Sequence, residues 1–122
     1  MKVRYFSLFS LFFLMCFSSS LFANPGKDIF DRFCTTCHTP AMAPMFNSPA
    51  AHDIDAWEVR KDDAFSRAVE KDSSLSKDEV SINELVKSAI HGTDKGMPPK
   101  GTCADCTDDE LKSVIEFMSS SE

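Results

Sequence analysis

The sequence predicts an all-α fold of three to five helices around a single core. Apolar residues recur at helical spacing in several segments, and most of these segments begin at residues that typically cap helices. No segment shows the period-2 alternation of apolar and polar residues that half-buried strands require. At 122 residues, the chain is about the size of one domain.

The N-terminus has the composition of a targeting segment. Lys2 and Arg4 give it a positive start, an uncharged stretch follows, and the small residue Ala23 precedes the polar Asn24. We therefore predict that residues 1–23 are a signal peptide cleaved after Ala23.

The mature domain is then residues 24–122, and export places it in the periplasm. An uncleaved membrane anchor is the alternative, because the uncharged stretch has 19 residues, close to the roughly 20 that span a bilayer. Lipid attachment at Cys16 is disfavoured because the bulky Leu14 and Met15 precede it.

Charge and cysteine content narrow the function further. Without Lys2 and Arg4, the mature domain keeps 11 of the 13 basic residues against 19 acidic ones, a net charge of −8. This charge disfavours nucleic acid as a partner and favours a basic surface on another protein. In an oxidising compartment, cysteines persist when paired, ligated or covalently modified. The mature domain has four, Cys34, Cys37, Cys103 and Cys106.

The first predicted helix begins at Asn24, a suitable cap, with Pro25 at the first helical position. It runs into Cys34–His38, and its apolar face comprises Ile29, Phe30 and Phe33. Residues 39–55 are expected to form a loop around something large, because three prolines interrupt them, Pro40, Pro44 and Pro49.

Two helices are predicted in the middle of the chain, over Asp62–Lys71 and over residues 82–90. Ser81 and Glu84 fit a capping box for the second helix, and Gly92 can take the left-handed conformation that ends it.

The last helix has the clearest start. Thr107 and Glu110 fit a capping box, and Asp108 and Asp109 suit the positive end of the helix dipole. The buried stripe of this helix is expected to contain Leu111, Val114, Ile115 and Met118.

Residues Cys34–His38 read CTTCH, the CxxCH pattern of covalent haem attachment. Two thiols add to the haem vinyl groups and the adjacent imidazole binds the iron. Positions three and four apart share one side of a helical turn, so all three side chains can reach one ring. A chance disulfide or half a zinc site is disfavoured because no second ligand pair follows at the spacing of a zinc site. A thioredoxin-like site is disfavoured because the βαβ context is missing.

The second iron ligand is predicted to be Met97. Pro98 and Pro99 keep the backbone around it extended, and glycines on both sides let the loop approach the ring. A thioether raises the potential, which suits a carrier. Met118 fits a core position instead. The rivals are Met42 and Met45 in the loop, and His91 and His52 for bis-histidine ligation.

Cys103 and Cys106 form a second CxxC. Thr107 follows them where a second haem would need histidine, so we expect one haem c per chain. We expect the pair to be a disulfide that braces the segment between Met97 and the last helix, and a catalytic redox role is the alternative.

These motifs together resemble the cytochrome c5 family of bacterial monohaem cytochromes. The resemblance rests on CTTCH at 34–38, MPPKG at 97–101, CADC at 103–106 and TDDEL at 107–111. It does not extend to the middle of the chain, where the segment 61–80 is longer and more charged than the family leads us to expect. Thr39 also replaces the glycine that usually follows the ligand histidine.

The resemblance implies a small monohaem cytochrome c fold wrapped around one covalently attached haem. It implies thioether bonds at Cys34 and Cys37, axial ligands His38 and Met97, and a disulfide between Cys103 and Cys106. Two further residues are implied beside the haem. Trp57 resembles the family's tryptophan between the two halves, and Pro44 resembles the proline whose carbonyl accepts a hydrogen bond from the ligand histidine.

The predicted function is one-electron transfer in the periplasm by a carrier, not an enzyme. The expected partners are a donor and an acceptor among redox proteins, with a terminal oxidase or a peroxidase as candidates, and the carrier is expected to be a monomer or a weak dimer. One alternative is a haem sensor or redox enzyme with an open sixth position. Another is a haem subunit of a respiratory complex, anchored by an uncleaved leader.

Overall fold

The computed structural model describes residues 23–68 and 76–121. The predicted leader, residues 1–23, lies almost wholly outside the described residues, as does Lys71, the predicted end of one helix. In the described ranges there is no strand, which confirms the all-α prediction. No helix of those ranges is both long and apolar enough to cross a bilayer. The elements in chain order are α1 Pro25–Ile29, η1 Phe30–Cys34, α2 Thr35–His38, α3 Ala43–Phe46, α4 Ile54–Ala68, α5 Lys77–His91, η2 Pro99–Thr102 and α6 Asp108–Ser119.

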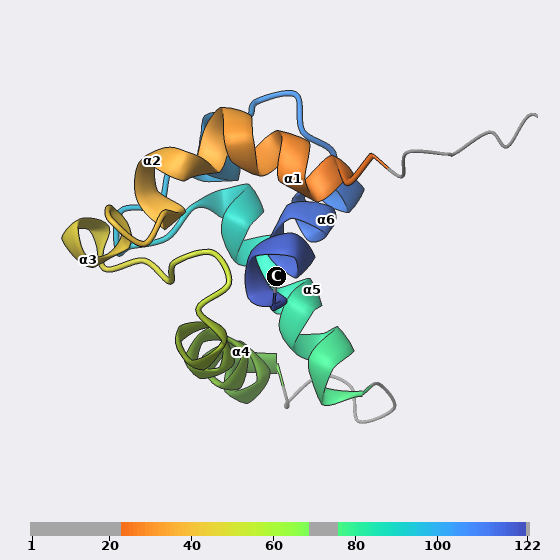
Figure 1. The fold of residues 1–122 in the computed structure, drawn as a ribbon. Coiled ribbons are helices and arrows are strands. Elements are labelled where there is room, and N and C mark those ends of the chain that lie inside the picture. Colours follow the sequence, from red (N-terminus) through yellow and green to blue (C-terminus); the bar gives the residue numbers. More distant parts are fainter. Residues whose placement is uncertain (1–22, 69–75, 122) are drawn as a thin grey trace, which may run out of the picture.

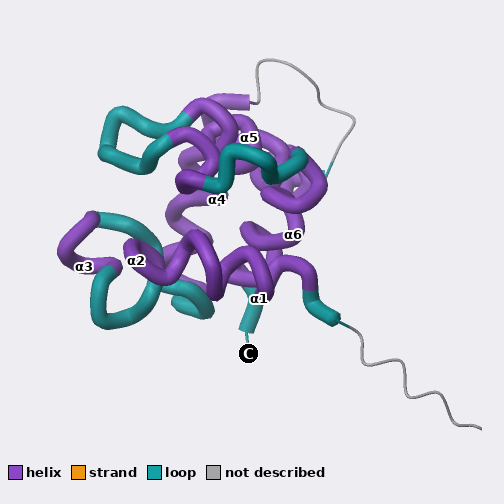
Figure 2. Tube along the Cα trace, turned by 90° about the horizontal axis from the view of Figure 1, so that it is seen from above, coloured by secondary structure: helices purple, strands orange, loops and turns teal. Residues whose placement is uncertain are grey.

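The helices pack in the spatial order α1, α6, α5 and α4 (Figure 1). Helix α6 lies between α1 and α5, and α5 packs in turn against α4. The short helix α3 lies to one side, away from α6, in both Figure 1 and Figure 2. The first and last helices of the domain therefore meet, and the middle of the chain covers the other side of α5.

The N-terminal helix begins where it was predicted. The Asn24 side chain accepts a hydrogen bond from the Lys27 amide at 3.2 Å, and Pro25 follows at the first helical position. The helix continues through η1, a π-helical turn, into α2, so the stretch from Pro25 to His38 is helical throughout with a wider turn in the middle.

Helices α1 and α6 approach closely at Gly26. A Cβ atom on Gly26 would stand 2.2 Å from the backbone oxygen of Ser113, so only glycine allows this contact. Beside it, the rings of Phe30 and Phe117 lie 5.5 Å apart between centroids. Aromatic contact and close backbone approach together fix how these two helices cross.

Helix α4 begins at Ile54, well before the predicted start at Asp62, and takes in the end of the predicted loop. The carboxylate of Asp53 accepts a hydrogen bond from the Ala56 amide at 3.1 Å, which satisfies a free donor of the first turn. Some apolar residues of this helix, such as Ile54 and Val59, are exposed, and only Trp57, Ala64 and Ala68 are buried, so the helix has no clear apolar stripe in sequence.

Helix α5 begins at Lys77, so the predicted cap at Ser81 is wrong. Ser76 is the cap, and its hydroxyl accepts a hydrogen bond from the Glu79 amide at 3.3 Å. Ser81 is instead completely buried within the helix and donates to the Lys77 carbonyl at 2.7 Å. The predicted end is confirmed, since Gly92 follows the helix with a φ of +76°.

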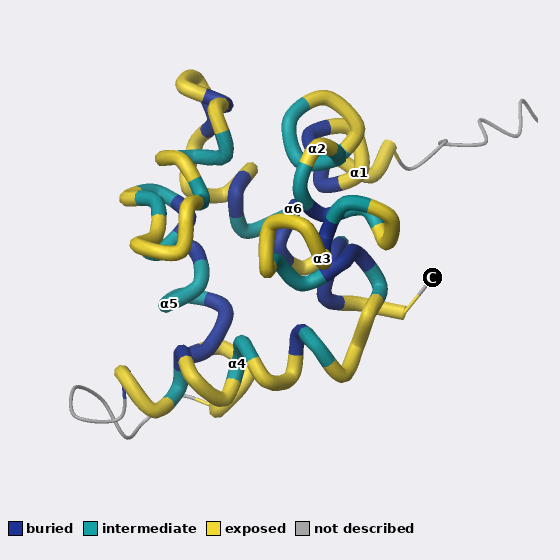
Figure 3. The backbone as a smooth tube through the Cα atoms, turned by 90° about the vertical axis from the view of Figure 1, so that its left-hand side faces the viewer, coloured by how far each residue is buried: buried dark blue, intermediate teal, exposed yellow. Residues whose placement is uncertain are grey.

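Helix α6 has the predicted capping box, with hydrogen bonds in both directions between Thr107 and Glu110. The whole predicted stripe of this helix is buried, and Figure 3 shows buried segments on α5 and α6 and mostly exposed backbone on α3. The large apolar side chains of the core are Ile29, Trp57, Ile82, Val86, Leu111, Val114, Ile115 and Met118.

Candidate haem attachment site

Cys34, Cys37 and His38 lie on the helical turns formed by the end of η1 and by α2. Both thiols are free and half-buried, and His38 is 8 % exposed. The local helix places the three side chains at positions that share one side, as the spacing predicts. A group bound there would meet two sulfur atoms and one imidazole.

The His38 ring is oriented by a backbone carbonyl. Its Nδ1 lies 2.8 Å from the oxygen of Pro49. Because a carbonyl can only accept, Nδ1 carries the proton and Nε2 keeps its lone pair for a metal.

The prediction that Pro44 accepts this hydrogen bond is therefore wrong. Pro44 is exposed within helix α3, whereas Pro49 lies in the loop that follows α3 and returns to His38. Three prolines are spread over this loop, and the sequence alone did not distinguish which of them returns to the imidazole.

The segment that holds His38 is attached by further hydrogen bonds that sequence analysis missed. The Ser48 hydroxyl donates to the Cys37 carbonyl, and the Ala51 amide donates to the His38 carbonyl at 2.7 Å. These residues are small and unremarkable in sequence, so only their position in a proline-rich loop after the motif signals a role.

Trp57 contacts this part of the site from helix α4. Its Nε1 donates to the Ala50 carbonyl at 2.8 Å, and its ring stacks on that of His38 at 6.0 Å between centroids. The neighbouring carbonyls of Pro49 and Ala50 thus accept from the histidine and from the tryptophan. Trp57 is 4 % exposed and belongs to the core.

Burial sets the protonation of the two reactive groups. It lowers the pKa of His38 against the opposing effect of the Pro49 hydrogen bond, with a further lowering from the Arg60 charge. Burial also raises the pKa of the Cys34 thiol to about 11, and the neighbouring Cys37 adds to this. The imidazole is therefore neutral, the form that binds metals, and the thiol is a poor thiolate ligand.

Met97 lies in the loop between α5 and η2 and is half-buried against the core. Its backbone is tied to Thr93, whose amide donates to the Met97 carbonyl at 2.9 Å and whose hydroxyl accepts from the Met97 amide at 3.3 Å. The next residue, Pro98, is extended. Element η2 contacts η1, so this loop lies beside the helix that carries the cysteines.

The other candidate ligands have different surroundings. Met45 is 75 % exposed, Met118 is buried in the stripe of α6, and His91 is exposed at the end of α5. The imidazole of His52 is engaged at the end of α6, where its Nδ1 lies 2.7 Å from the Ser120 carbonyl. Met42 is half-buried in the turn before α3.

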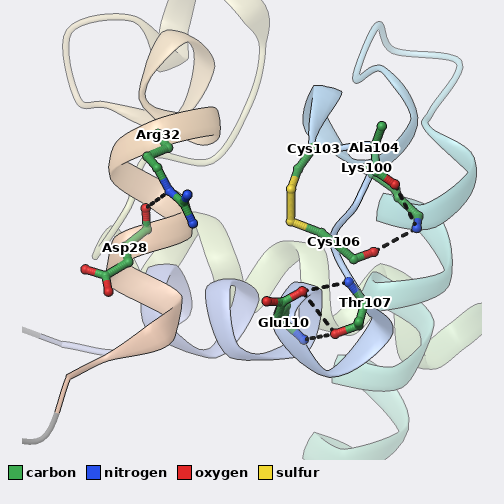
Figure 4. Close-up of a disulfide and its surroundings, with 8 residues drawn as sticks. All are labelled: Asp28, Arg32, Lys100, Cys103, Ala104, Cys106, Thr107 and Glu110. Carbon is green, nitrogen blue, oxygen red and sulfur yellow. Dashed lines mark hydrogen bonds between the residues drawn. A yellow bond between two sulfur atoms is a disulfide. The ribbon is translucent and has the colours of Figure 1, made fainter.

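Cys103 and Cys106 form a disulfide in the structure, with their Cα atoms 5.4 Å apart. Both residues are buried, and they bridge the short segment between η2 and α6 (Figure 4). The bridge therefore lies between the Met97 loop and the capped start of the last helix.

The chemistry of the site fits a haem. Free thiols, an imidazole with an available Nε2 and a thioether are the donors that covalent haem attachment requires. Several apolar side chains that pack against the core are only partly buried, namely Phe30, Phe33, Leu85, Ile90, Met97 and Phe117. A large planar apolar ring bound at the two cysteines can cover those among them that lie beside it.

Comparison with known proteins agrees with this fit. A family model described as cytochrome c oxidase, cbb3-type, subunit III matches residues 22–118. Cytochrome c5 of Azotobacter vinelandii is 34% identical over 97 residues, which cover 80% of this chain and 94% of that protein. Cytochrome c5 of Ectopseudomonas mendocina is also 34% identical over 97 residues, which cover 80% of this chain and 90% of that protein. The chain therefore belongs to the cytochrome c family, which implies a covalently bound haem c and a role in electron transfer.

Proposed function

We propose that this chain is a periplasmic one-electron carrier whose single haem c is bound through thioethers at Cys34 and Cys37 and through the axial ligands His38 and Met97. The observation that supports this most directly is the hydrogen bond from His38 Nδ1 to the Pro49 carbonyl. It leaves Nε2 free beside two half-buried thiols.

The bound haem supplies an iron that alternates between the ferric and ferrous states. His38 and Met97 would hold this iron, and the apolar side chains around the site would reduce its contact with water. The Pro49 hydrogen bond would increase electron donation by the His38 imidazole, whereas the Met97 thioether would favour the reduced iron. Apolar contacts at the edge of the core keep the charge change in a low-dielectric environment, and no bond of a substrate has to be made or broken.

The proposed location and partners follow from the leader and the charge. A cleaved leader delivers the domain to the periplasm, where a disulfide such as Cys103–Cys106 persists. The net charge of −8 without the leader favours docking to basic surfaces of a donor and an acceptor, among which a terminal oxidase or a peroxidase suits the chemistry. Intact-mass analysis distinguishes cleavage after Ala23 from an uncleaved anchor.

The proposal is tested by optical spectra of the protein purified from a periplasmic extract, oxidised and then reduced, with and without carbon monoxide. We expect the weak long-wavelength band of methionine bound to ferric iron, and we expect no change with carbon monoxide. Ready binding of carbon monoxide would show an open sixth position and would overturn Met97 ligation in favour of a sensor or an enzyme.

A further inference from the structure

Lys100 lies three residues after Met97, in η2, and its side chain reaches back to the disulfide loop. Its ammonium group donates to the Cys106 carbonyl at 2.7 Å and to the Ala104 carbonyl at 3.4 Å. Figure 4 shows the side chain beside the disulfide, directed at these two oxygens. Lys100 is half-buried, whereas Lys27, Lys77, Lys87 and Lys95 are exposed.

The backbone around Lys100 has an unfavourable conformation. Lys100, Gly101 and Thr102 have φ values of +54°, +57° and +74° in succession. Left-handed backbone costs free energy for residues that carry a Cβ, so two of these three positions are strained. Such a turn persists only if contacts outside the backbone stabilise it, and the two hydrogen bonds of the Lys100 ammonium group are contacts of this kind.

The same turn determines where the Met97 side chain lies. The Met97 methyl carbon is 3.8 Å from the position a Cβ on Gly101 would occupy, so the thioether lies over the left-handed turn. The Gly101 amide donates to the Pro98 carbonyl at 2.9 Å, and this hydrogen bond closes the turn that directly follows Met97. If the turn relaxes, the Met97 methyl group loses this neighbour and the side chain is free to move.

The disulfide makes the loop that contains the two acceptor carbonyls rigid. Cys103 and Cys106 are both buried, and the Cys106 amide donates to the Cys103 carbonyl at 3.1 Å. The carbonyl that Lys100 binds most closely thus belongs to a cross-linked loop, directly before the capped start of α6. Lysine suits this task because its ammonium group can donate to several carbonyls at once.

We infer that Lys100 is a positioning residue for Met97, which ties the turn that presents the thioether to the disulfide loop. This inference deepens the proposed function and rests on it, since it presumes that Met97 is the sixth ligand. A charge-assisted contact to a rigid loop would hold the Met97 side chain in place toward the haem, and its loss would let solvent and small ligands compete with the thioether for the iron.

The test compares K100M, K100R and K95M as haem proteins with the wild type. Methionine keeps the length and apolar stem of lysine and removes the donors, and arginine retains donors. Lys95 is exposed in the turn before Met97, so K95M removes the same charge near the iron. The readouts are the long-wavelength methionine–iron band, the midpoint potential and carbon monoxide binding to the ferrous protein, with thermal unfolding measured in parallel.

We expect K100M to lose at least half of the intensity of the methionine–iron band, to bind carbon monoxide and to have a lower midpoint potential. We expect K100R and K95M to keep the wild-type band. Equal losses in K95M and K100M would overturn the inference, because charge alone would then explain them. A K100M protein that unfolds at lower temperature but keeps a full band and excludes carbon monoxide would also overturn it.

K100Q is measured in the same assays, because glutamine, unlike methionine, offers the iron no thioether, and K100Q alone decides if K100M cannot be isolated in folded form. Glutamine has an amide donor on a shorter stem, so it cannot keep the lysine contact to Cys106, and a wild-type band in K100Q overturns the inference. Failure of the proposed function is visible separately. In that case the wild type itself lacks the band or binds carbon monoxide.

Discussion

On each side of the proposed iron site, a backbone carbonyl accepts a hydrogen bond from a side chain. Pro49 accepts from His38, and Cys106 accepts from Lys100. Such partners are invisible in sequence because every residue has a carbonyl, and only the path of the chain selects which one is used. The side chains with distinctive chemistry could be predicted, whereas their hydrogen-bond partners could not.

Substitution of Met97 by alanine tests the distal ligand at the scale of one side chain. We expect M97A to retain covalent haem, to bind carbon monoxide when reduced and to have a lower midpoint potential, because thioether ligation favours the ferrous iron. Optical spectra and redox titration measure this. M45A is the control, since Met45 is 75 % exposed on α3. The assignment fails if M45A, and not M97A, opens the site.

Substitution of Trp57 by phenylalanine tests the hydrogen bond that Trp57 donates beside His38. The variant keeps an aromatic ring but leaves the Ala50 carbonyl without its donor, and we expect the free energy of unfolding to fall by about 1–2 kcal/mol. Urea denaturation of the haem-bound protein measures the change. The control is V59A on the same helix, where the side chain is 60 % exposed. Equal stability of W57F and the wild type would show that this hydrogen bond is dispensable.

Helix ends set by local chemistry were predictable, and those set by tertiary contacts were not. The Asn24 cap, the Thr107–Glu110 box and the Gly92 terminus are where their residue types placed them. Ser81 has a capping side chain, yet the apolar face of α5 extends to Val80, which is buried, and the helix therefore begins earlier, at the cap Ser76.

The contact between α1 and α6 predicts a strict requirement for glycine at position 26. Although alanine favours helices, we expect G26A to lower the free energy of unfolding by about 1–3 kcal/mol, because the added methyl group meets backbone that cannot move aside. Chemical denaturation measures this. K27A, at the exposed neighbouring position, should remain close to the wild type. A G26A protein as stable as K27A would mean that the helices can separate without cost.

The cap of α6 predicts a pH-dependent contribution to stability. Hydrogen bonds from the Thr107 amide and hydroxyl hold the pKa of Glu110 below its ordinary value of 4.5. Such a carboxylate stabilises the fold above pH 4.5, and this stabilisation is lost as the pH falls through the lowered pKa. We expect E110Q to have a lower Tm than the wild type at neutral pH, with the difference closing below pH 4.5.

Thermal unfolding of the haem protein across a pH series checks this. E116Q is the control, because Glu116 lies in the exposed part of the last turns of the same helix and does not take part in the capping box. If the deficit of E110Q persists unchanged at acid pH, the stabilisation does not come from the ionised carboxylate.

At the scale of the whole molecule, the haem is expected to be part of the core. The chain leaves several large apolar side chains at the core edge only partly covered, and a domain of this size buries little surface by itself. We therefore expect the double variant C34S/C37S, produced without haem, to be largely unfolded. Far-UV circular dichroism and amide proton dispersion measure this. A cooperatively folded haem-free domain would show that the polypeptide core is sufficient.

The meeting of α1 with α6 has a consequence for the order of events in folding. These helices lie at opposite ends of the domain, so their contact closes a loop that includes almost every other element, and contacts so distant in sequence form slowly. The CTTCH segment continues directly from α1. Until the last helix has emerged and docked, the helix that leads into this segment lacks its partner at Gly26, so we expect the segment to become fixed late in folding.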